Sequence, residues 1–345
     1  KFSYSSDFIY NIVIKSDFRI ESDNDYSNDL DMAVTFEPEN SGEYIFKIHN
    51  QYQNGYYNNH ALDRRTDVVL LGASVMAAMD VERNFARLFY DAGKSAYSLA
   101  QGGPYGPLQF RDAYHKFIVE PGIKHRYVVI LLILPNEFNK IHQSRRLIAE
   151  GKDYRDLFQA SVIADVFPPF FAPWTITMAM KLPNILPNVI DRFRKSSNDE
   201  MLTVRLSNRS FSFPASLFQR PHYKERWDDL KEALGEIFIT ANANGAQTLV
   251  LYYPLAPVLS LPFIKGHDEI VGNLEAYYQE TVSRLETVVA ELGGEFMDVT
   301  PALRPALFKE EIMLEPGGYH LNQRGVGAVF SVVYNRLKRM KLKFD

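Results

Sequence analysis

The stretch "VVLLGASVMAAMD" (68–80) places one serine directly after a run of apolar residues. The run 68–71 is typical of a short buried strand, and Gly72 permits a tight turn after it. Ser74 then has two interpretations. Its hydroxyl is a nucleophile presented on a strand-to-helix turn, or it caps the helix that follows, where serine is a preferred residue. The stretch by itself favours the cap.

Three further polar or flexible groups follow apolar runs or precede the last helix. Gly102 and Gly103 lie in "SLAQGGPYG", Asn136 lies in "LPNEF", and His320 lies in "EPGGYHLNQRG". Each has an ordinary alternative, because glycine and asparagine are common in turns and a histidine can cap or pack on a helix. Taken together, in this order along the chain, they favour a catalytic site.

The chemistry that these groups offer is attack on an ester. A serine hydroxyl is a weak nucleophile until a base removes its proton, and the neutral imidazole of His320 is suited to that near pH 7. Attack on the carbonyl places negative charge on oxygen, which preorganised N–H donors stabilise. The candidate donors are the Ser74 N–H, the Gly103 N–H and the Asn136 side-chain amide.

The elements that must position these groups alternate between strand and helix from residue 66 onward. The pattern predicts strands at 68–71, 95–100, 127–134, 247–254 and 295–299. It predicts helices at 81–93, 107–120, 225–245, 269–292 and 322–340. Such alternation indicates a three-layer αβα sandwich with a central parallel five-stranded sheet. In such a sheet the working site lies beyond the carboxyl ends of the strands.

Two segments stand outside this alternation. Residues 1–65, rich in Tyr, Asn and Asp, are expected to form strands and loops that wrap the main domain, residues 66–345. An insertion at about 151–222 contains the apolar stretch "VFPPFFAPWTITMAM" (166–180), which is shorter than the roughly 20 residues that a membrane-spanning helix needs. The insertion is a lid or a surface for membrane contact, or an excursion packed on the domain.

Composition narrows the class of protein. The formal net charge is −4 without a basic block, which argues against a nucleic-acid partner. The chain has no cysteine, which excludes disulfides and thiolate sites and suits an oxidising compartment. An acidic stretch at 23–34 resembles a calcium loop, but Asn28 and Val34 stand where that loop needs Gly and Glu, so we expect no metal.

Four short blocks resemble the SGNH (GDSL-like) hydrolases. They are "LLGASVM", "SLAQGGPYGPLQF", "ILPNEF" and "YHLNQRGVGAVF", in the family's order. The resemblance covers about 66–138 and 225–340. It implies an SGNH-hydrolase-like αβα fold, Ser74 as nucleophile, His320 as base, and Gly103 and Asn136 with the Ser74 N–H as the oxyanion hole. It implies no metal and no organic cofactor.

The chain departs from the family's pattern at several positions. Ala73 stands where the middle residue of the first block is usually aspartate, and Ser98 stands where the second block usually has asparagine. Gly317 and Gly318 occupy the positions three and two residues before His320, where the family's catalytic aspartate would be sought.

The partner of the second ring nitrogen of His320 therefore stays open. Glu315 lies five residues before the histidine, and the flexible stretch between them lets a longer side chain reach back. Asp298 ends the last strand but looks more like the cap of a helix that opens at Pro301. A backbone carbonyl would leave a Ser–His dyad. We favour Glu315 slightly.

The leading functional hypothesis is an extracytoplasmic serine esterase or acyltransferase acting on O-acyl (acetyl) groups of a glycan. Abundant aromatic residues, 20 Tyr and 24 Phe, suit carbohydrate or lipid contact. A lipid or thioester hydrolase with an apolar acyl pocket is the second hypothesis. A non-catalytic binding protein on a decayed fold is the third, motivated by Ala73 and Gly317. The chain starts at Lys1, so we expect any signal or anchor segment to lie upstream.

Overall fold

The structure is a computed structural model of the 345-residue chain. It describes the following residues: 2–4, 19–22, 32–38, 44–49, 52–53, 56–58, 64–78, 81–101, 105–134, 136–151, 201–206, 210–214, 226–264, 267–309, 312–313 and 320–340.

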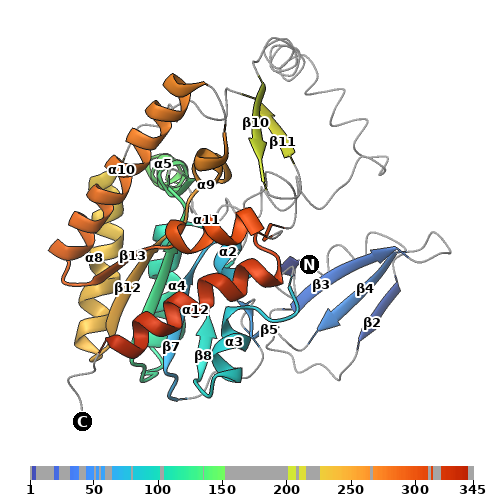
Figure 1. The fold of residues 1–345 in the computed structure, drawn as a ribbon. Helices are drawn as coiled ribbons and strands as arrows, with labels where there is room; N and C mark the ends of the chain where they lie inside the picture. The colour runs from blue at the N-terminus through green and yellow to red at the C-terminus, as the bar shows by residue number, and fades with distance from the viewer. Residues whose placement is uncertain are drawn as a thin grey trace.

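A five-stranded parallel sheet forms the centre of the fold (Figure 1). Its strands are β7 (Val68–Gly72), β8 (Ala96–Ser98), β9 (Tyr127–Leu132), β12 (Gln247–Tyr252) and β13 (Glu295–Asp298). Their order across the sheet is β13-β12-β9-β7-β8. The three-layer αβα class with five parallel strands is therefore as predicted, and each of the five predicted strands is present.

The order of the strands reverses between β7 and β9. From β7 the chain goes outward to β8, then returns past β7 to β9 and continues to β12 and β13. In a doubly wound sheet, ligands bind outside the carboxyl ends of the strands at this switch point. Ser74 follows β7 and Asn136 follows β9, so both flank it.

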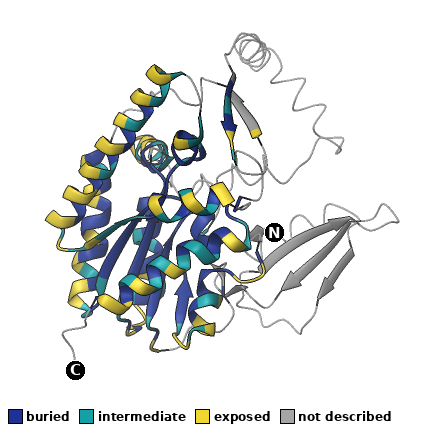
Figure 2. Ribbon diagram, viewed as in Figure 1, coloured by how far each residue is buried: buried dark blue, intermediate teal, exposed yellow. Residues whose placement is uncertain are grey.

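Helices cover both faces of the sheet, as Figures 1 and 2 show. One face carries α4 (Pro107–Tyr114), α5 (Asn136–Ala149), α8 (Trp227–Ala243) and α10 (Asp268–Glu291), and the other carries α3 (Phe85–Asp91), α11 (Thr300–Lys309) and α12 (Gln323–Arg339). Successive side chains of a strand point to opposite faces, so Val69 and Leu71 join one core while Val68 and Leu70 join the other.

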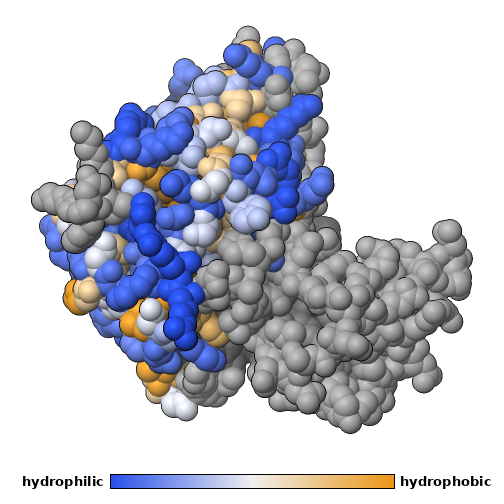
Figure 3. All heavy atoms as spheres, turned by 90° about the horizontal axis from the view of Figure 1, so that it is seen from below, coloured by the Kyte–Doolittle hydropathy of each residue, from blue (hydrophilic) through white to orange (hydrophobic). Residues whose placement is uncertain are grey.

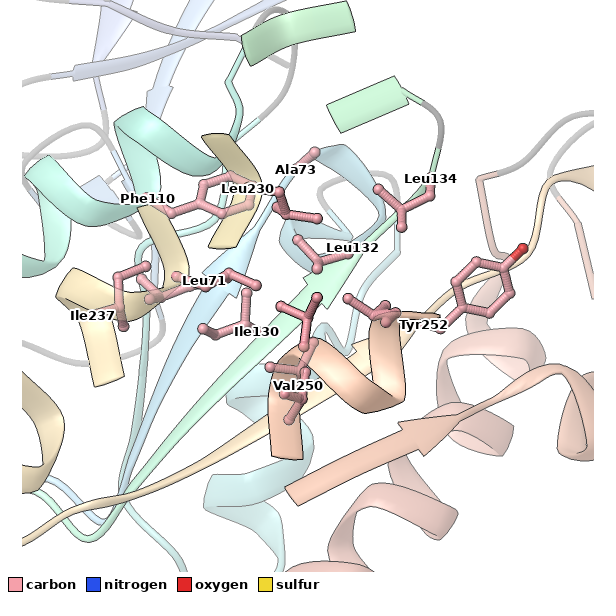
Figure 4. Packing of buried hydrophobic residues seen from close by; sticks show 14 of the residues in the cluster. Leu71, Ala73, Phe110, Ile130, Leu132, Leu134, Leu230, Ile237, Val250 and Tyr252 are labelled. Atoms are coloured by element: carbon pink, nitrogen blue, oxygen red, sulfur yellow. The ribbon is translucent and has the colours of Figure 1, made fainter. Parts of the chain in front are cut away.

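The continuous apolar run of β9 is buried on both sides. Val128, Ile130 and Leu132 pack in one core, and Val129 and Leu131 pack in the other. Figure 4 shows the first of these cores, where Ile130 and Leu132 lie among the side chains of β7, α4 and α8. This is the arrangement expected for a central parallel strand.

Several element boundaries differ from the predictions. The helix expected at 81–93 begins only at Phe85, because the Asn84 side chain accepts a hydrogen bond from the Arg87 N–H and caps it. The helix expected at 107–120 divides into α4 and a π-helical turn, His115–Val119. Among the described helices, α5 and the short α9 (Ala256–Ser260) were not predicted.

The N-terminal part contains strands of its own. β1 (Phe2–Tyr4), β2 (Arg19–Ser22), β3 (Met32–Pro38) and β4 (Tyr44–His49) form a second sheet in the order β1-β3-β4-β2. β5 (Tyr52–Gln53) and β6 (Tyr56–Tyr57) form a small antiparallel pair. Strands and loops were expected here, while the wrapping role assigned to 1–65 stays a prediction.

Asn58 joins this N-terminal part to the edge of the central sheet. Its side-chain N–H donates to the Ser98 carbonyl at 2.9 Å, and its side-chain oxygen accepts from the Ser98 N–H at 2.7 Å. Ser98 ends β8, the strand at the edge of the sheet, and both residues are buried. The asparagine amide therefore pairs with the outward backbone groups of Ser98 as a neighbouring strand would.

The insertion includes an antiparallel hairpin, β10 (Met201–Arg205) and β11 (Ser210–Pro214). The apolar stretch 166–180 lies outside the described residues. Within the part of the chain that is described, no helix is long and apolar enough to cross a membrane. Seen from below, the described surface is mainly hydrophilic, with apolar residues scattered over it (Figure 3).

Candidate active site

Ser74 is the first residue of the four-residue helix α2 (Ser74–Ala77), which follows β7 directly. The N-cap position belongs to Ala73, and no side chain caps the helix. The cap interpretation of Ser74 is therefore wrong. The serine lies one residue beyond the cap, and its side chain is half-buried while Val75, Met76 and Ala77 are buried.

Gly72 is needed at this turn for space. A Cβ on Gly72 would lie 2.6 Å from Cβ of Met76 and 3.3 Å from the carbonyl oxygen of Leu131. Its backbone does not have a positive φ angle, so the freedom to make a tight turn is not the reason for the glycine. The missing side chain lets the first turn of α2 pack back onto the end of β7.

His320 meets Ser74 across 246 positions of the sequence. Its Nε2 lies 2.8 Å from the Ser74 Oγ, within hydrogen-bonding distance. Both side chains are half-buried. When Nδ1 carries the ring proton, Nε2 accepts from the hydroxyl, which is the arrangement that a base needs. The structure therefore brings together the two residues that the sequence predicts as nucleophile and base.

The residues after His320 fix its position. Leu321 is buried and forms a β-bridge with Met313. The Asn322 side chain accepts from the Arg324 and Gly325 N–H groups and caps α12. A Cβ on Gly325 would come within 2.4 Å of the Ile312 carbonyl oxygen, so only glycine fits there.

Gln323 ties the histidine segment to the serine segment. Its side-chain oxygen accepts from the Arg83 N–H at 2.8 Å, and its side-chain N–H donates to the Arg83 carbonyl at 2.9 Å. Arg83 lies between α2 and α3, and Gln323 is the third residue after His320. Sequence reasoning missed this contact, because nothing in either segment indicates that they meet.

Asn136 is the first residue of α5, after the end of β9. β7 and β9 are paired neighbours in register, with Gly72 opposite Leu131, so their carboxyl ends lie side by side. Asn136 and Ser74 follow these two ends. Asn136 lies where the turn after β9 passes into α5, so its place agrees with a turn residue as well as with a donor. Its role as an oxyanion donor stays a prediction.

Two predicted site residues lie outside the described residues, namely Gly103 and Glu315. Their proposed roles stay predictions. Asp298, the other acidic candidate, accepts from the Thr300 N–H at 2.8 Å and from the Tyr278 hydroxyl. It therefore caps α11, as the sequence indicated.

The described residues contain no group of three or more His, Asp or Glu side chains arranged to hold a metal ion. At the carboxyl end of the sheet the structure places a hydroxyl and an imidazole within hydrogen-bonding distance. It supports proton transfer from the Ser74 hydroxyl to His320 and attack on a carbonyl carbon.

Comparison with known proteins gives structural neighbours only. No protein-family model matches the chain, and no curated protein matches it. The chain is similar to a GDSL-like lipase from Bacteroides thetaiotaomicron, with a TM-score of 0.41 and 10% identity over 82% of this chain and 93% of that one.

Other similar structures carry related names. An extracellular lipase from Streptomyces rimosus has a TM-score of 0.39 and 12% identity over 79% of this chain and 99% of that one. An acetyl xylan esterase has a TM-score of 0.40 and 10% identity over 79% and 99%. These structures that the chain is similar to are thus named as lipases and an esterase.

Proposed function

We propose that the protein is a serine esterase or acyltransferase in which Ser74 attacks the ester carbonyl and His320 acts as the base. The observation that carries this proposal is the 2.8 Å contact between the Ser74 Oγ and the His320 Nε2 at the switch point of the sheet. A helix cap would not require a histidine at this distance, and Ser74 does not cap α2.

In the acylation step His320 Nε2 takes the hydroxyl proton as Oγ bonds to the carbonyl carbon. The tetrahedral intermediate collapses, the protonated imidazole returns the proton to the leaving alkoxide, and the acyl group remains on Ser74. Water or a sugar hydroxyl then gives its proton to His320 as its oxygen bonds to the acyl carbon, and the Ser74 Oγ leaves and takes that proton back from the imidazole. Water gives hydrolysis and a sugar hydroxyl gives transfer.

The charge on the carbonyl oxygen requires donors that are already in place. The Ser74 N–H belongs to the first turn of α2, where backbone N–H groups have no acceptor within the helix. Asn136 starts α5, which follows the neighbouring strand β9, and we propose its side-chain amide as the second donor. With the Gly103 N–H they make up the oxyanion hole of the proposal.

The imidazole also needs a partner on Nδ1 that fixes its tautomer and stabilises its charged form. Asp298 is engaged with Thr300 and Tyr278. We keep Glu315 as the proposed partner and the Ser–His dyad as the alternative. The paired serine and histidine favour a working enzyme over a decayed binding protein.

The substrate that we propose is an O-acetyl group on a glycan, in an extracytoplasmic setting. Its support is the aromatic composition, the absence of cysteine and the substrate range of the family that the sequence resembles. The rate on acetyl esters compared with octanoyl esters tests this part. A strong preference for octanoyl would instead support the lipid or thioester hydrolase.

A serine-directed phosphonate tests the central part of the proposal. We expect one covalent adduct, which peptide mass spectrometry places on Ser74, and no adduct in Ser74→Ala. His320→Ala should slow the labelling strongly, because the hydroxyl then has no base. An adduct on another residue, or labelling of Ser74→Ala at the same rate, would contradict the assignment.

A further inference from the structure

The strand-to-helix turn that carries Asn136 contains a fully buried carboxyl group. Glu137 is 0% exposed and follows the asparagine directly. It occupies the first inward position of α5, on the same side as Ile141 and Ser144, four and seven residues further on. An apolar residue would be ordinary at such a position, since burying a carboxylate is costly.

The carboxyl group of Glu137 forms a hydrogen bond across the turn, to the backbone of Ile133. Its Oε2 accepts from the Ile133 N–H at 2.8 Å, while the Glu137 N–H donates to the Ile133 carbonyl at 3.4 Å. Residues 133 and 137 are thus joined by two hydrogen bonds, one through the side chain and one through the backbone. Asn136 lies inside this ring, so its backbone is held at both sides.

Lys140 supports the carboxyl group from the next turn of α5. Its Nζ lies 3.6 Å from the Glu137 Oε1, and its side chain is only 15% exposed. Its stem runs over Gly106, the N-cap residue of α4, where a Cβ would come within 2.8 Å of the Lys140 Cβ. Burial raises the pKa of the Glu137 carboxyl, and the Lys140 ammonium opposes that rise.

We propose that Glu137 is the positioning residue of Asn136, holding the side-chain amide at the place where the oxyanion forms. This inference rests on the proposed function. Glu137 does not touch the substrate. Its carboxyl group fixes the Ile133–Glu137 turn. The Asn136 amide is then already in place and does not have to reorganise when negative charge develops on the carbonyl oxygen of the substrate.

A double-mutant cycle on kcat tests this role, with Asn136→Ala and Glu137→Ala as the single variants. We expect Glu137→Ala to lower kcat by about 10- to 100-fold, since a misplacement of about 1 Å can cost 10²-fold. KM should stay nearly constant, because the lost interaction forms only in the transition state. In the Asn136→Ala background the same change should lower kcat by less than about threefold, because the group that it positions is already gone.

Ser144→Ala is the matched control on the same side of α5. It removes the hydrogen bond from the Gln109 side chain at 3.2 Å but does not touch the turn. Its kcat should equal that of the wild type. If the fold-losses of kcat caused by Glu137→Ala and Asn136→Ala multiply in the double variant, the two residues act independently and the proposal is overturned. A kcat for Ser144→Ala as low as that for Glu137→Ala would also overturn it, because α5 as a whole would then be loosened.

Two further variants decide the matter if Glu137→Ala does not fold. Glu137→Gln keeps an acceptor for the Ile133 N–H and should retain kcat within about threefold, whereas Glu137→Asp, one methylene shorter, should lose about tenfold. The reverse order would overturn the proposal. Full activity of Ser74→Ala would instead overturn the proposed function and this inference together, so the two failures are distinguishable.

Discussion

Two histidine–hydroxyl pairs lie at opposite ends of the central sheet. At the carboxyl end, His320 Nε2 lies 2.8 Å from the Ser74 Oγ. At the amino end, just before β9, His125 Nε2 lies 2.7 Å from the Tyr114 hydroxyl. The distances are nearly the same, but His125 and Tyr114 are buried whereas Ser74 and His320 are half-buried.

The amino-end pair shows what a structural histidine looks like in this fold. Its Nδ1 lies 3.0 Å from the Ile123 carbonyl oxygen, so Nδ1 donates and Nε2 accepts from tyrosine. Burial lowers the pKa of His125 and raises the pKa of Tyr114, and both shifts keep the pair neutral. A short contact alone therefore does not indicate catalysis. Burial and the type of hydroxyl separate the two pairs.

Removing each hydroxyl gives the largest contrast. Ser74→Ala should lower kcat on p-nitrophenyl acetate by roughly 10⁶-fold, the loss typical of a serine nucleophile, with a nearly unchanged melting temperature. Tyr114→Phe should leave kcat unchanged but cost about 1–3 kcal/mol of stability, because the buried His125 Nε2 loses its donor. Steady-state kinetics and thermal unfolding measure the two effects. Full activity in Ser74→Ala would remove the distinction between the pairs.

Changing the partner of the second ring nitrogen, Nδ1 of the histidine, gives the next largest effect on kcat. His125 uses a backbone carbonyl there, and the proposal for His320 is the Glu315 carboxylate. Glu315→Gln should then lower kcat by about 10⁴-fold, as the equivalent change does in a serine-protease triad. If His320 also uses a backbone carbonyl, the loss should be under about tenfold, or roughly 1.4 kcal/mol of activation free energy. The kcat of this variant decides between triad and dyad.

An oxyanion donor, Asn136, is proposed for the carboxyl-end pair and none for the amino-end pair. Asn136→Ala should lower kcat by about 10²–10³-fold and change KM little. The kcat and KM values from initial rates on a small acetyl ester test this split. An effect on KM alone would show that Asn136 serves the start of α5 and not the transition state.

The two pairs also differ in how they are held together. Tyr114 and His125 are close in sequence, whereas Ser74 and His320 depend on distant contacts such as that between Gln323 and Arg83. Gln323→Ala should lower kcat by about tenfold at constant KM, because a small displacement of the base is enough. Gln279→Ala, which removes an exposed side-chain contact to Glu275, is the control and should have no effect.

The smallest predicted effect is a pH dependence of the free energy of unfolding, caused by the protonation of His125. Well above about pH 6.5, the ordinary pKa of histidine, the side chain is neutral in both folded and unfolded states. Below that pH the unfolded chain binds a proton that the folded chain resists, since burial lowers the folded pKa. Stability should therefore fall as the pH drops, by at most about 1.4 kcal/mol per pH unit from this group.

Denaturant unfolding between pH 7 and pH 5 measures that slope. The double variant His125→Leu/Tyr114→Phe removes both partners, which can be nearly neutral for stability, and its slope should be smaller than that of the wild type. Equal slopes would show that other groups cause the acid sensitivity.

The parallel sheet was predictable because its strands are short apolar runs separated by helical patterns. The strand β9 can be recognised without knowledge of the tertiary structure, since a strand buried on both faces is apolar throughout. The helix α5 was not predicted, because its charged sequence "NEFNKIHQSRRLIA" buries only Glu137, Phe138, Ile141 and Ser144. The buried Glu137 interrupts the helical spacing of apolar residues by which a core-facing helix is recognised in a sequence.

The candidate site was predictable in its residue types but not in its supports. Ser74, Asn136 and His320 follow from their places at the ends of elements, together with the resemblance of the blocks. The contact of Gln323 with Arg83 spans 240 positions of the sequence and depends on where α12 packs. The role of Gly72 was predicted as conformational and is instead a matter of space against Met76.

The pairing of Asn58 with Ser98 has a consequence for self-association. An open edge strand offers unpaired N–H and C=O groups to any other extended chain, and proteins that leave such an edge uncovered risk joining edge to edge. Here the edge strand is only three residues long, and the outward groups of its last residue are already taken by a side-chain amide. A single asparagine thus occupies the backbone groups that an added strand would need at that point.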